Sequence, residues 1–108
     1  MADSFYRHDE GKADWSILDM ELLEYVTRVF MFGAAKYERD NWRQCHTEDD
    51  INRTYSSLFR HLIAQQKDTT SIAFDEESEL PHLAHIICNA IILYSAINKR
   101  VRDRSSDS

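Results

Sequence analysis

The sequence predicts an all-α protein, a helical bundle whose core is completed by oligomerisation. Only two Gly and one Pro occur among its 108 residues, too few for the many tight turns of a β-sandwich or barrel. Three segments carry apolar residues at steps of three and four, which is the period of an amphipathic helix. A chain of this length makes one domain with a small core, and such a core is commonly completed by a partner.

The chain divides into an arm, a helical domain and a tail. Residues 1–15 show neither helical nor alternating periodicity, but we expect an ordered arm because its large aromatic residues favour burial. These aromatic residues are Phe5, Tyr6 and Trp15. Residues 16–99 hold the helices. Residues 100–108 become rich in Ser and Asp and are expected to be disordered.

Each predicted helix has a start signal. Ser16 precedes Asp19 by three residues, and Thr47 precedes Asp50 by three, the spacing at which side chains cap the first backbone N–H groups. The third helix follows Pro81, whose missing N–H is harmless in a first turn. This third helix is apolar on nearly all sides, so we expect it to be the central and most buried element.

Composition excludes several classes of protein. The formal net charge of −6 argues against general nucleic-acid binding, which requires a basic surface. No apolar run is long enough to span a bilayer, and no secretory signal segment is recognisable, so we expect a cytoplasmic protein without membrane partners. The two cysteines, Cys45 and Cys88, form neither a disulfide framework nor a CxxC metal site.

Histidines at helical spacing indicate a metal site. His82 and His85 share one face of the third helix, within reach of one ion, although histidines at a helix start often only bond to neighbouring backbone. His61 and Glu24 lie at the margins of the apolar stripes of the other helices, where side chains can converge in a bundle. Imidazoles with one carboxylate favour Mn, Co, Ni or Zn over Mg. Asn89, one turn beyond His85, either bonds to a neighbouring helix or orients a ligand.

The loop over residues 36–43 combines aromatic and basic side chains. Tyr37 and Trp42 could stack on a nucleobase, while Lys36, Arg39 and Arg43 could contact phosphates. The alternative role for Trp42 is to anchor this loop in the core. The loop is therefore a candidate nucleotide-binding segment.

Five segments follow one another in a fixed order between about residues 7 and 95: HDEGKADW, LLEYVTRVFMFGAAKY, NWRQ, LFRHLIA and DEESELPHLAHIICNAIIL. Together they resemble the small helical dATP/dGTP diphosphohydrolase domains of bacteriophages, relatives of the MazG-like all-α nucleotide pyrophosphohydrolases. The resemblance implies a four-helix-bundle-like, oligomeric fold. It also implies hydrolysis of a nucleoside triphosphate to the monophosphate and pyrophosphate.

The resemblance also implies where the metal binds. In the better-known relatives, ExxE and ExxD pairs on two helices hold Mg²⁺ or Mn²⁺. Glu21 and Glu24 match the first pair, whereas His82 and His85 occupy the place of the second.

These arguments lead to a metal-dependent diphosphohydrolase of purine dNTPs, using Mn or Mg, or else Zn, Co or Ni. Glu24 and His61 are the expected catalytic residues, and together with His82 and His85 they are the expected metal ligands. The expected nucleotide-binding residues are Lys12, Lys36, Tyr37, Trp42, Arg43, Arg60 and Asn89. Alternatives are a nucleotide-sequestering protein that keeps the pocket without hydrolysis, and a helical interaction module.

The apolar third helix also predicts self-association. An exposed patch of this size is unusual in a monomer, so we expect a homodimer or homotetramer in which this helix pairs with its symmetry mate. Ile92→Glu is expected to disrupt that pairing. If the chain is encoded by a phage, the site of action is the host cytoplasm.

Overall fold

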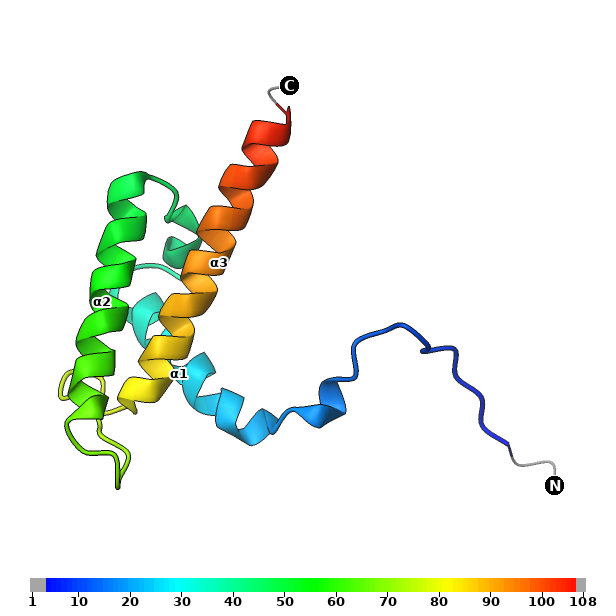
Figure 1. Cartoon of the computed structure of the whole chain (residues 1–108), viewed down its shortest axis with the longest axis horizontal. Helices are drawn as coiled ribbons and strands as arrows, with labels where there is room; N and C mark the ends of the chain where they lie inside the picture. The colour runs from blue at the N-terminus through cyan, green and yellow to red at the C-terminus, as the bar shows by residue number, and fades with distance from the viewer. Residues whose placement is uncertain (1–3, 107–108) are drawn as a thin grey trace.

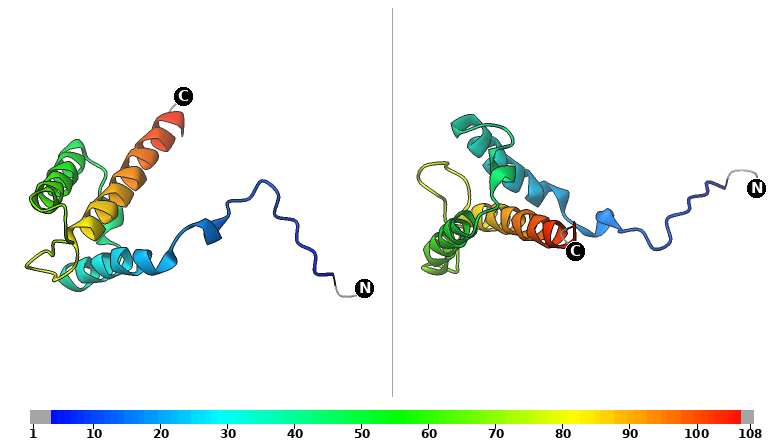
Figure 2. Two further views of the ribbon diagram at one scale, coloured as in Figure 1. Left: turned by 60° about the horizontal axis from the view of Figure 1, so that its bottom comes forward. Right: turned by 90° about the horizontal axis from the view of Figure 1, so that it is seen from above.

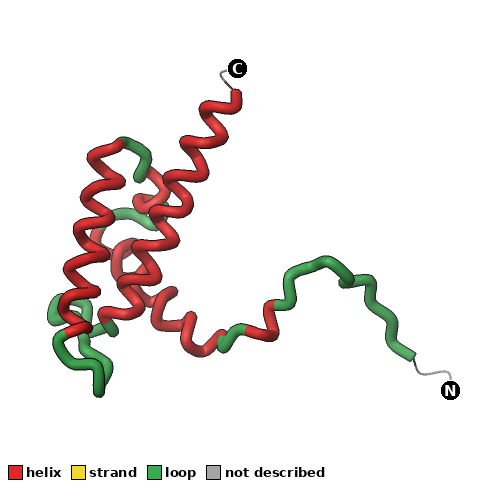
Figure 3. Tube along the Cα trace, in the orientation of Figure 1, coloured by secondary structure: helices red, strands yellow, loops and turns green. Residues whose placement is uncertain are grey.

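The computed structural model describes residues 4–106 and is helical throughout its regular elements (Figures 1 and 3). Residues 4–106 contain no named strand, and the one isolated β-bridge joins Phe74 to Pro81. The all-α prediction is therefore confirmed. The elements in chain order are η1 (Trp15–Ile17), α1 (Met20–Lys36), η2 (Asn41–Gln44), α2 (Glu48–Gln66) and α3 (His82–Ser106).

Helix α3 is the central element, as the sequence predicts. It packs against α1, α2 and η2, and Figure 2 shows α1 and α2 on different sides of it. Its contacts with α1 and α2 form two small clusters of buried residues. The cluster with α1 comprises Val26, Val29, Ala84 and Cys88, and the cluster with α2 comprises Ile51, Leu93 and Ala96.

The predicted capping box of α2 is confirmed. Thr47 Oγ1 accepts a hydrogen bond from the Asp50 backbone N–H at 3.0 Å, and the Asp50 carboxylate accepts one from the Thr47 N–H at 3.3 Å. The predicted start of α1 at Ser16 is wrong, because the cap is Asp19, which accepts a bond from the Glu21 N–H at 3.0 Å. Ser16 instead lies in η1 and donates to Asp14.

The two ends of the chain differ from expectation. Phe5, Tyr6 and Trp15 are 77%, 79% and 67% exposed, because the arm runs away from the helices and no helix among residues 4–106 covers it (Figure 1). At the other end, α3 continues through Ser106 where disorder is expected from residue 100. The segment after Pro81 contains no Gly or Pro to stop the helix, and Arg100 Nε donates to the His46 carbonyl at 3.1 Å. Residues 1–3 and 107–108 lie outside the described part.

None of the helices described is both long and apolar enough to cross a membrane.

Candidate functional site

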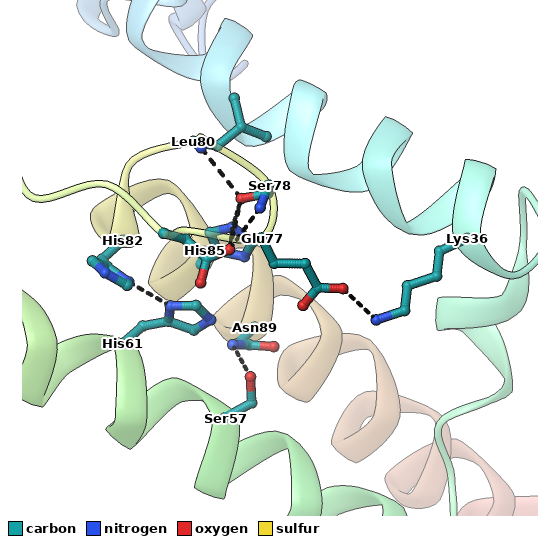
Figure 4. Close-up of polar contacts among 10 residues, drawn as sticks. Lys36, Ser57, His61, Glu77, Ser78, Leu80, His82, His85 and Asn89 are labelled. Carbon is teal, nitrogen blue, oxygen red and sulfur yellow. Dashed lines mark hydrogen bonds and ion pairs between the residues drawn. The ribbon is translucent and has the colours of Figure 1, made fainter.

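Three histidines from two helices meet where α2 packs against the start of α3 (Figure 4). The rings of His61 and His85 stack with their centroids 4.3 Å apart. His61 Nδ1 lies 2.7 Å from His82 Nδ1, so one of these nitrogens carries a hydrogen and donates a hydrogen bond to the other. The structure thus brings together the three imidazoles that the sequence analysis groups.

The carboxylate beside these imidazoles comes from the loop between α2 and α3. Asp75 Oδ2 lies 3.9 Å from His85 Nε2. Ser78 connects the two, because its backbone N–H and its Oγ lie 2.8 and 3.0 Å from Asp75 Oδ2. The same Oγ lies 2.7 Å from His85 Nε2.

The loop is held in place by backbone bonds near both of its ends. Gln65 Oε1 at the end of α2 accepts from the Ala73 N–H at 2.9 Å, and the Ala73 carbonyl accepts from the His82 N–H at 2.9 Å. The Asp75 N–H donates to the Leu80 carbonyl at 2.8 Å. These bonds fold residues 73–82 back on themselves, so Asp75 is brought to the first turn of α3.

Three of these residues can share one metal ion. His61, Asp75 and His85 each offer a ligand atom, and the three atoms lie within 4.8 Å of one another. Two imidazoles with one carboxylate suit Zn²⁺ and its transition-metal neighbours. His82 stands next to this group and contacts it through His61.

Glu24, the carboxylate expected at this site, lies elsewhere. It sits on the exposed side of α1, where its Oε2 pairs with Arg28 Nε at 3.3 Å. The sequence analysis missed Asp75 because it falls in an acidic loop without helical periodicity. The usable signal was its position between the apolar residues Ile72 and Phe74 and the start of α3.

Burial favours the neutral form of two of the imidazoles, those of His61 and His85. It lowers the pKa of His61 to about 4, and the neighbouring His85 contributes to that shift. Burial likewise lowers the pKa of His85, against the opposing effect of Asp75. For Asp75, burial alone would raise the pKa, but the hydrogen bonds from Ser78 bring it below its usual value. At neutral pH His61 and His85 are therefore neutral imidazoles with lone pairs to donate, and Asp75 is an ionised carboxylate.

A cavity of about 530 Å³ adjoins the cluster, bounded by α1, η2, α2 and α3. Its volume is in the range of small-molecule sites. His85 belongs both to the histidine cluster and to the wall of this cavity. Asn89 lies on the same wall and donates from Nδ2 to Ser57 Oγ at 3.2 Å. The bond to the neighbouring helix, one of the two roles that the sequence allows for Asn89, is therefore present, and Asn89 also lies on the cavity wall.

The aromatic residues of the 36–43 loop also reach this cavity. Tyr37 and Trp42 both line it. Trp42 in addition packs edge-on against Phe30, with ring centroids 5.1 Å apart. The Arg43 guanidinium lies 4.3 Å from the Trp42 ring centroid. Trp42 is thus both an anchor of the loop and a wall of the cavity.

Most of the predicted basic residues lie away from the cavity wall. Lys36 Nζ pairs with Glu77 Oε1 at 2.7 Å, Arg60 donates to Ser56 Oγ at 3.0 Å, and Lys12 belongs to the exposed arm. The guanidinium groups that line the cavity belong to Arg39 and Arg53. Arg53 was missed, although it shares one face of α2 with two residues of the site.

That face of α2 carries Arg53, Ser57 and His61 at steps of four residues, which places their side chains in one row. The row explains how a single helix contributes to the cavity wall, to the Asn89 bond and to the histidine cluster. The same spacing could have identified Arg53 from the sequence.

Comparison with known proteins agrees with the resemblance drawn from the five segments. The family described as "dATP/dGTP diphosphohydrolase, N-terminal" matches residues 4–105, which include the arm and nearly all of α3. A dATP/dGTP diphosphohydrolase of Salmonella phage PMBT28 is 31% identical over 94 residues, covering 87% of this chain and 30% of that protein. The chain thus spans less than a third of this relative's length. No solved structure matches this chain. The chain belongs to the family of dATP/dGTP diphosphohydrolase N-terminal domains.

Proposed function

We propose that this domain binds a purine deoxynucleoside triphosphate together with a divalent ion and hydrolyses it to the monophosphate and pyrophosphate. One observation carries the proposal: His85 belongs to the group of potential metal ligands and also lines a cavity of nucleotide size. The printed name of the phage relative supports the substrate class. We place the reaction in the cytoplasm of an infected cell, where deoxynucleotides are used.

In this proposal His61, Asp75 and His85 hold the ion. Their donor set fits Mn²⁺, Co²⁺ or Zn²⁺ better than Mg²⁺, which prefers oxygen ligands and water. A bound ion of this kind polarises a phosphoryl oxygen and lowers the pKa of an attacking water. Ser78 holds Asp75 in position through the two bonds to its Oδ2.

The cavity wall binds the nucleotide. Arg39 and Arg53 neutralise the triphosphate locally, which an acidic protein must do. Tyr37 is 61% exposed and offers a ring on which a base can stack. Asn89 is positioned by Ser57 to contact the base edge. Lys36 and Arg43 lie next to this wall in the chain and are the nearest additional cations for the phosphates.

The direct test is to incubate the purified chain with each of the four dNTPs and one divalent ion at a time, and to measure pyrophosphate. We expect release from dATP or dGTP with Mn²⁺, Co²⁺ or Zn²⁺. Binding of these nucleotides in calorimetry without any turnover would instead support the sequestering function. If the chain neither binds nor hydrolyses these nucleotides with any ion, both the hydrolytic and the sequestering function are refuted.

Two matched variants test the ligand assignment. Asp75→Asn removes the carboxylate charge from the cluster and should lower turnover by about 100-fold or more, because even outer partners of metal ligands are worth about 10–100-fold. Asp68→Asn changes an exposed aspartate of the same loop, which bonds Thr70 and Ser71, and should leave turnover within about twofold.

Glu24→Gln decides between the two candidate carboxylates. We expect little change in turnover, since Glu24 is paired on the exposed face of α1. Loss of turnover in Glu24→Gln together with retained turnover in Asp75→Asn would show that Glu24 is the catalytic carboxylate instead.

A further inference from the structure

An ion pair links the last residue of α1 to the loop between α2 and α3. Lys36 Nζ lies 2.7 Å from Glu77 Oε1, although the two residues are 41 positions apart in the chain. Figure 4 shows the Glu77 side chain starting beside Ser78 and His85 and extending towards Lys36. The pair therefore spans the space between the histidine cluster and α1.

The ammonium group of this pair lies next to the candidate nucleotide cavity. Gly33 and Tyr37, which precede Lys36 by three positions and follow it by one, both line the cavity. Lys36 Nζ lies 5.5 Å from the centroid of the Tyr37 ring. Because the lysine side chain is long and flexible, its ammonium group can turn from Glu77 to a ligand in the cavity.

The carboxylate of the pair lies next to the candidate metal ligands. Glu77 directly precedes Ser78, whose hydroxyl contacts both Asp75 and His85. Burial lowers the pKa of His85, and the charge of Glu77 is one of the effects that oppose this shift. Glu77 does not belong to the group of three ligands around His61, since its carboxylate is turned towards Lys36. A rotation away from Lys36 would bring it closer to that group.

The fold does not depend on this ion pair. The side chains of Lys36 and Glu77 are 45% and 62% exposed, and an exposed ion pair contributes little to stability. The loop that carries Glu77 is already fixed near both of its ends by the bonds of Gln65, His82 and Leu80. Lys36 and Glu77 can therefore exchange partners at little cost to the fold.

The charge of the cavity wall gives a reason for such an exchange. The wall carries two arginines, Arg39 and Arg53, and two carboxylates, Glu38 and Asp50, so these formal charges cancel. A triphosphate entering the cavity needs further positive charge, and Lys36 stands at the edge of the wall. A phosphate group carries more negative charge and more acceptor oxygens than a carboxylate, so it competes well for this lysine.

We propose that the triphosphate takes Lys36 from Glu77, and that the released carboxylate becomes a further ligand of the ion at the histidine cluster. This inference rests on the proposed function and extends it, because nucleotide and ion then strengthen each other's binding. The coupling is reciprocal, so each raises the affinity of the other by the same factor. The added ligand is an oxygen, the kind that Mn²⁺ accepts readily.

Binding of Co²⁺ alone tests the release of Glu77 without any nucleotide. Lys36→Gln frees the carboxylate permanently, so it should raise Co²⁺ affinity in calorimetry by about tenfold, the scale of effects at the partners of metal ligands. Glu77→Gln alone should change the affinity by about twofold or less, because Glu77 is paired in the unmodified chain. In the double variant the gain of Lys36→Gln should disappear.

Lys67→Gln is the matched control for the loss of a positive charge. Lys67 is exposed at the end of α2, and its removal leaves the Lys36–Glu77 pair in place. Its Co²⁺ affinity should stay within about twofold of that of the unmodified chain. A gain in Lys36→Gln no larger than that of the control, or a gain that persists in the double variant, would overturn the proposal.

Binding of dATP in the presence of EDTA tests the exchange at Lys36. No divalent ion is then available for turnover, and Glu77→Gln removes the carboxylate that competes for the lysine. Its dATP affinity should exceed that of Glu76→Gln, which loses the same charge from the neighbouring exposed residue, by about fivefold. Equal affinities of these two variants would overturn the exchange and leave the proposed function intact. If no chain binds dATP with or without an ion, the proposed function itself is refuted, and this inference with it.

Discussion

The two faces of α3 differ in the size of their side chains more than in their polarity. The buried positions of α3 are Ala84, Cys88, Leu93 and Ala96, with 4%, 6%, 6% and 2% exposure, and the small size of three of these four lets α1 and α2 approach closely. The opposite face carries larger residues such as Ile87 and Tyr94, which remain 44% and 76% exposed. An apolar helix can thus have one face for its own fold and another for a partner, and hydrophobicity alone does not tell them apart.

The site face has a second property that the exposed face of α3 lacks, which is polar side chains with partners inside the chain. His85 contacts Ser78, and Asn89 donates to Ser57. The exposed apolar positions of α3 are Leu83, Ile87, Ala90, Ile91, Tyr94, Ile97 and Val101, and Tyr94 is the one titratable residue among them. We expect changes on the site face to alter stability and ligand binding, and changes on the exposed face to alter the predicted self-association.

The largest expected difference between the two faces is the difference in stability between the variants Ile92→Glu and Ile87→Glu. Ile92 packs against the α1–α3 core cluster and lines the cavity, so a glutamate there should lower the free energy of unfolding by about 2–4 kcal/mol. Ile87→Glu should lower stability only at concentrations where the unmodified chain is a dimer. Thermal melts at two protein concentrations would show this, and identical behaviour of the two variants at both concentrations would contradict it.

This expectation corrects the use of Ile92 as an interface residue. The sequence places Ile92 among many apolar residues of the helix, but the structure turns it towards the core. Loss of the oligomer in Ile92→Glu would therefore follow from lost folding, which the melts separate from lost pairing.

Ser57→Ala tests whether the polar partner of Asn89 matters for the cavity. Removing the Ser57 hydroxyl loses a bond worth about 1 kcal/mol, so we expect nucleotide affinity to fall by about fivefold. The neighbouring Ser56→Ala is the control, because Ser56 bonds Arg60 outside the cavity wall. Calorimetry with dATP and dGTP measures both, and equal effects of the two serines would refute a role for the Asn89 bond.

The smallest expected effect is a pH dependence that comes from the site face. The pKa of His61 in the folded chain is about 4, below its ordinary value of 6.5, so the unfolded chain binds the proton more readily. Its contribution to stability is fully present above pH 6.5 and is lost as the pH falls towards 4. Urea unfolding should show lower stability at pH 5 than at pH 7.

His61→Gln should flatten this pH dependence, and His8→Gln in the exposed arm should not. If the stability of His61→Gln depends on pH as strongly as that of the unmodified chain, the pH dependence comes from a group other than His61.

Local pattern was enough to predict the three helices, the Thr47 cap and the central place of α3. These features depend on the period of apolar residues and on hydrogen bonds between residues close in the chain. Both can be recognised from residues a few positions apart in the sequence. The three histidines were also grouped correctly, because two of them lie one turn apart and the third lies on the margin of a stripe that had to face them.

Only the tertiary structure decided which carboxylate joins the histidines and which face of α3 stays open. Asp75 reaches the cluster through a loop whose path depends on bonds from Gln65 and His82, and a loop has no period from which that path can be read. The open face of α3 is as apolar as the buried one, so its exposure depends on where α1 and α2 pack. Packing follows the size and shape of side chains brought together from distant parts of the chain, which the order of residues along a single helix does not reveal.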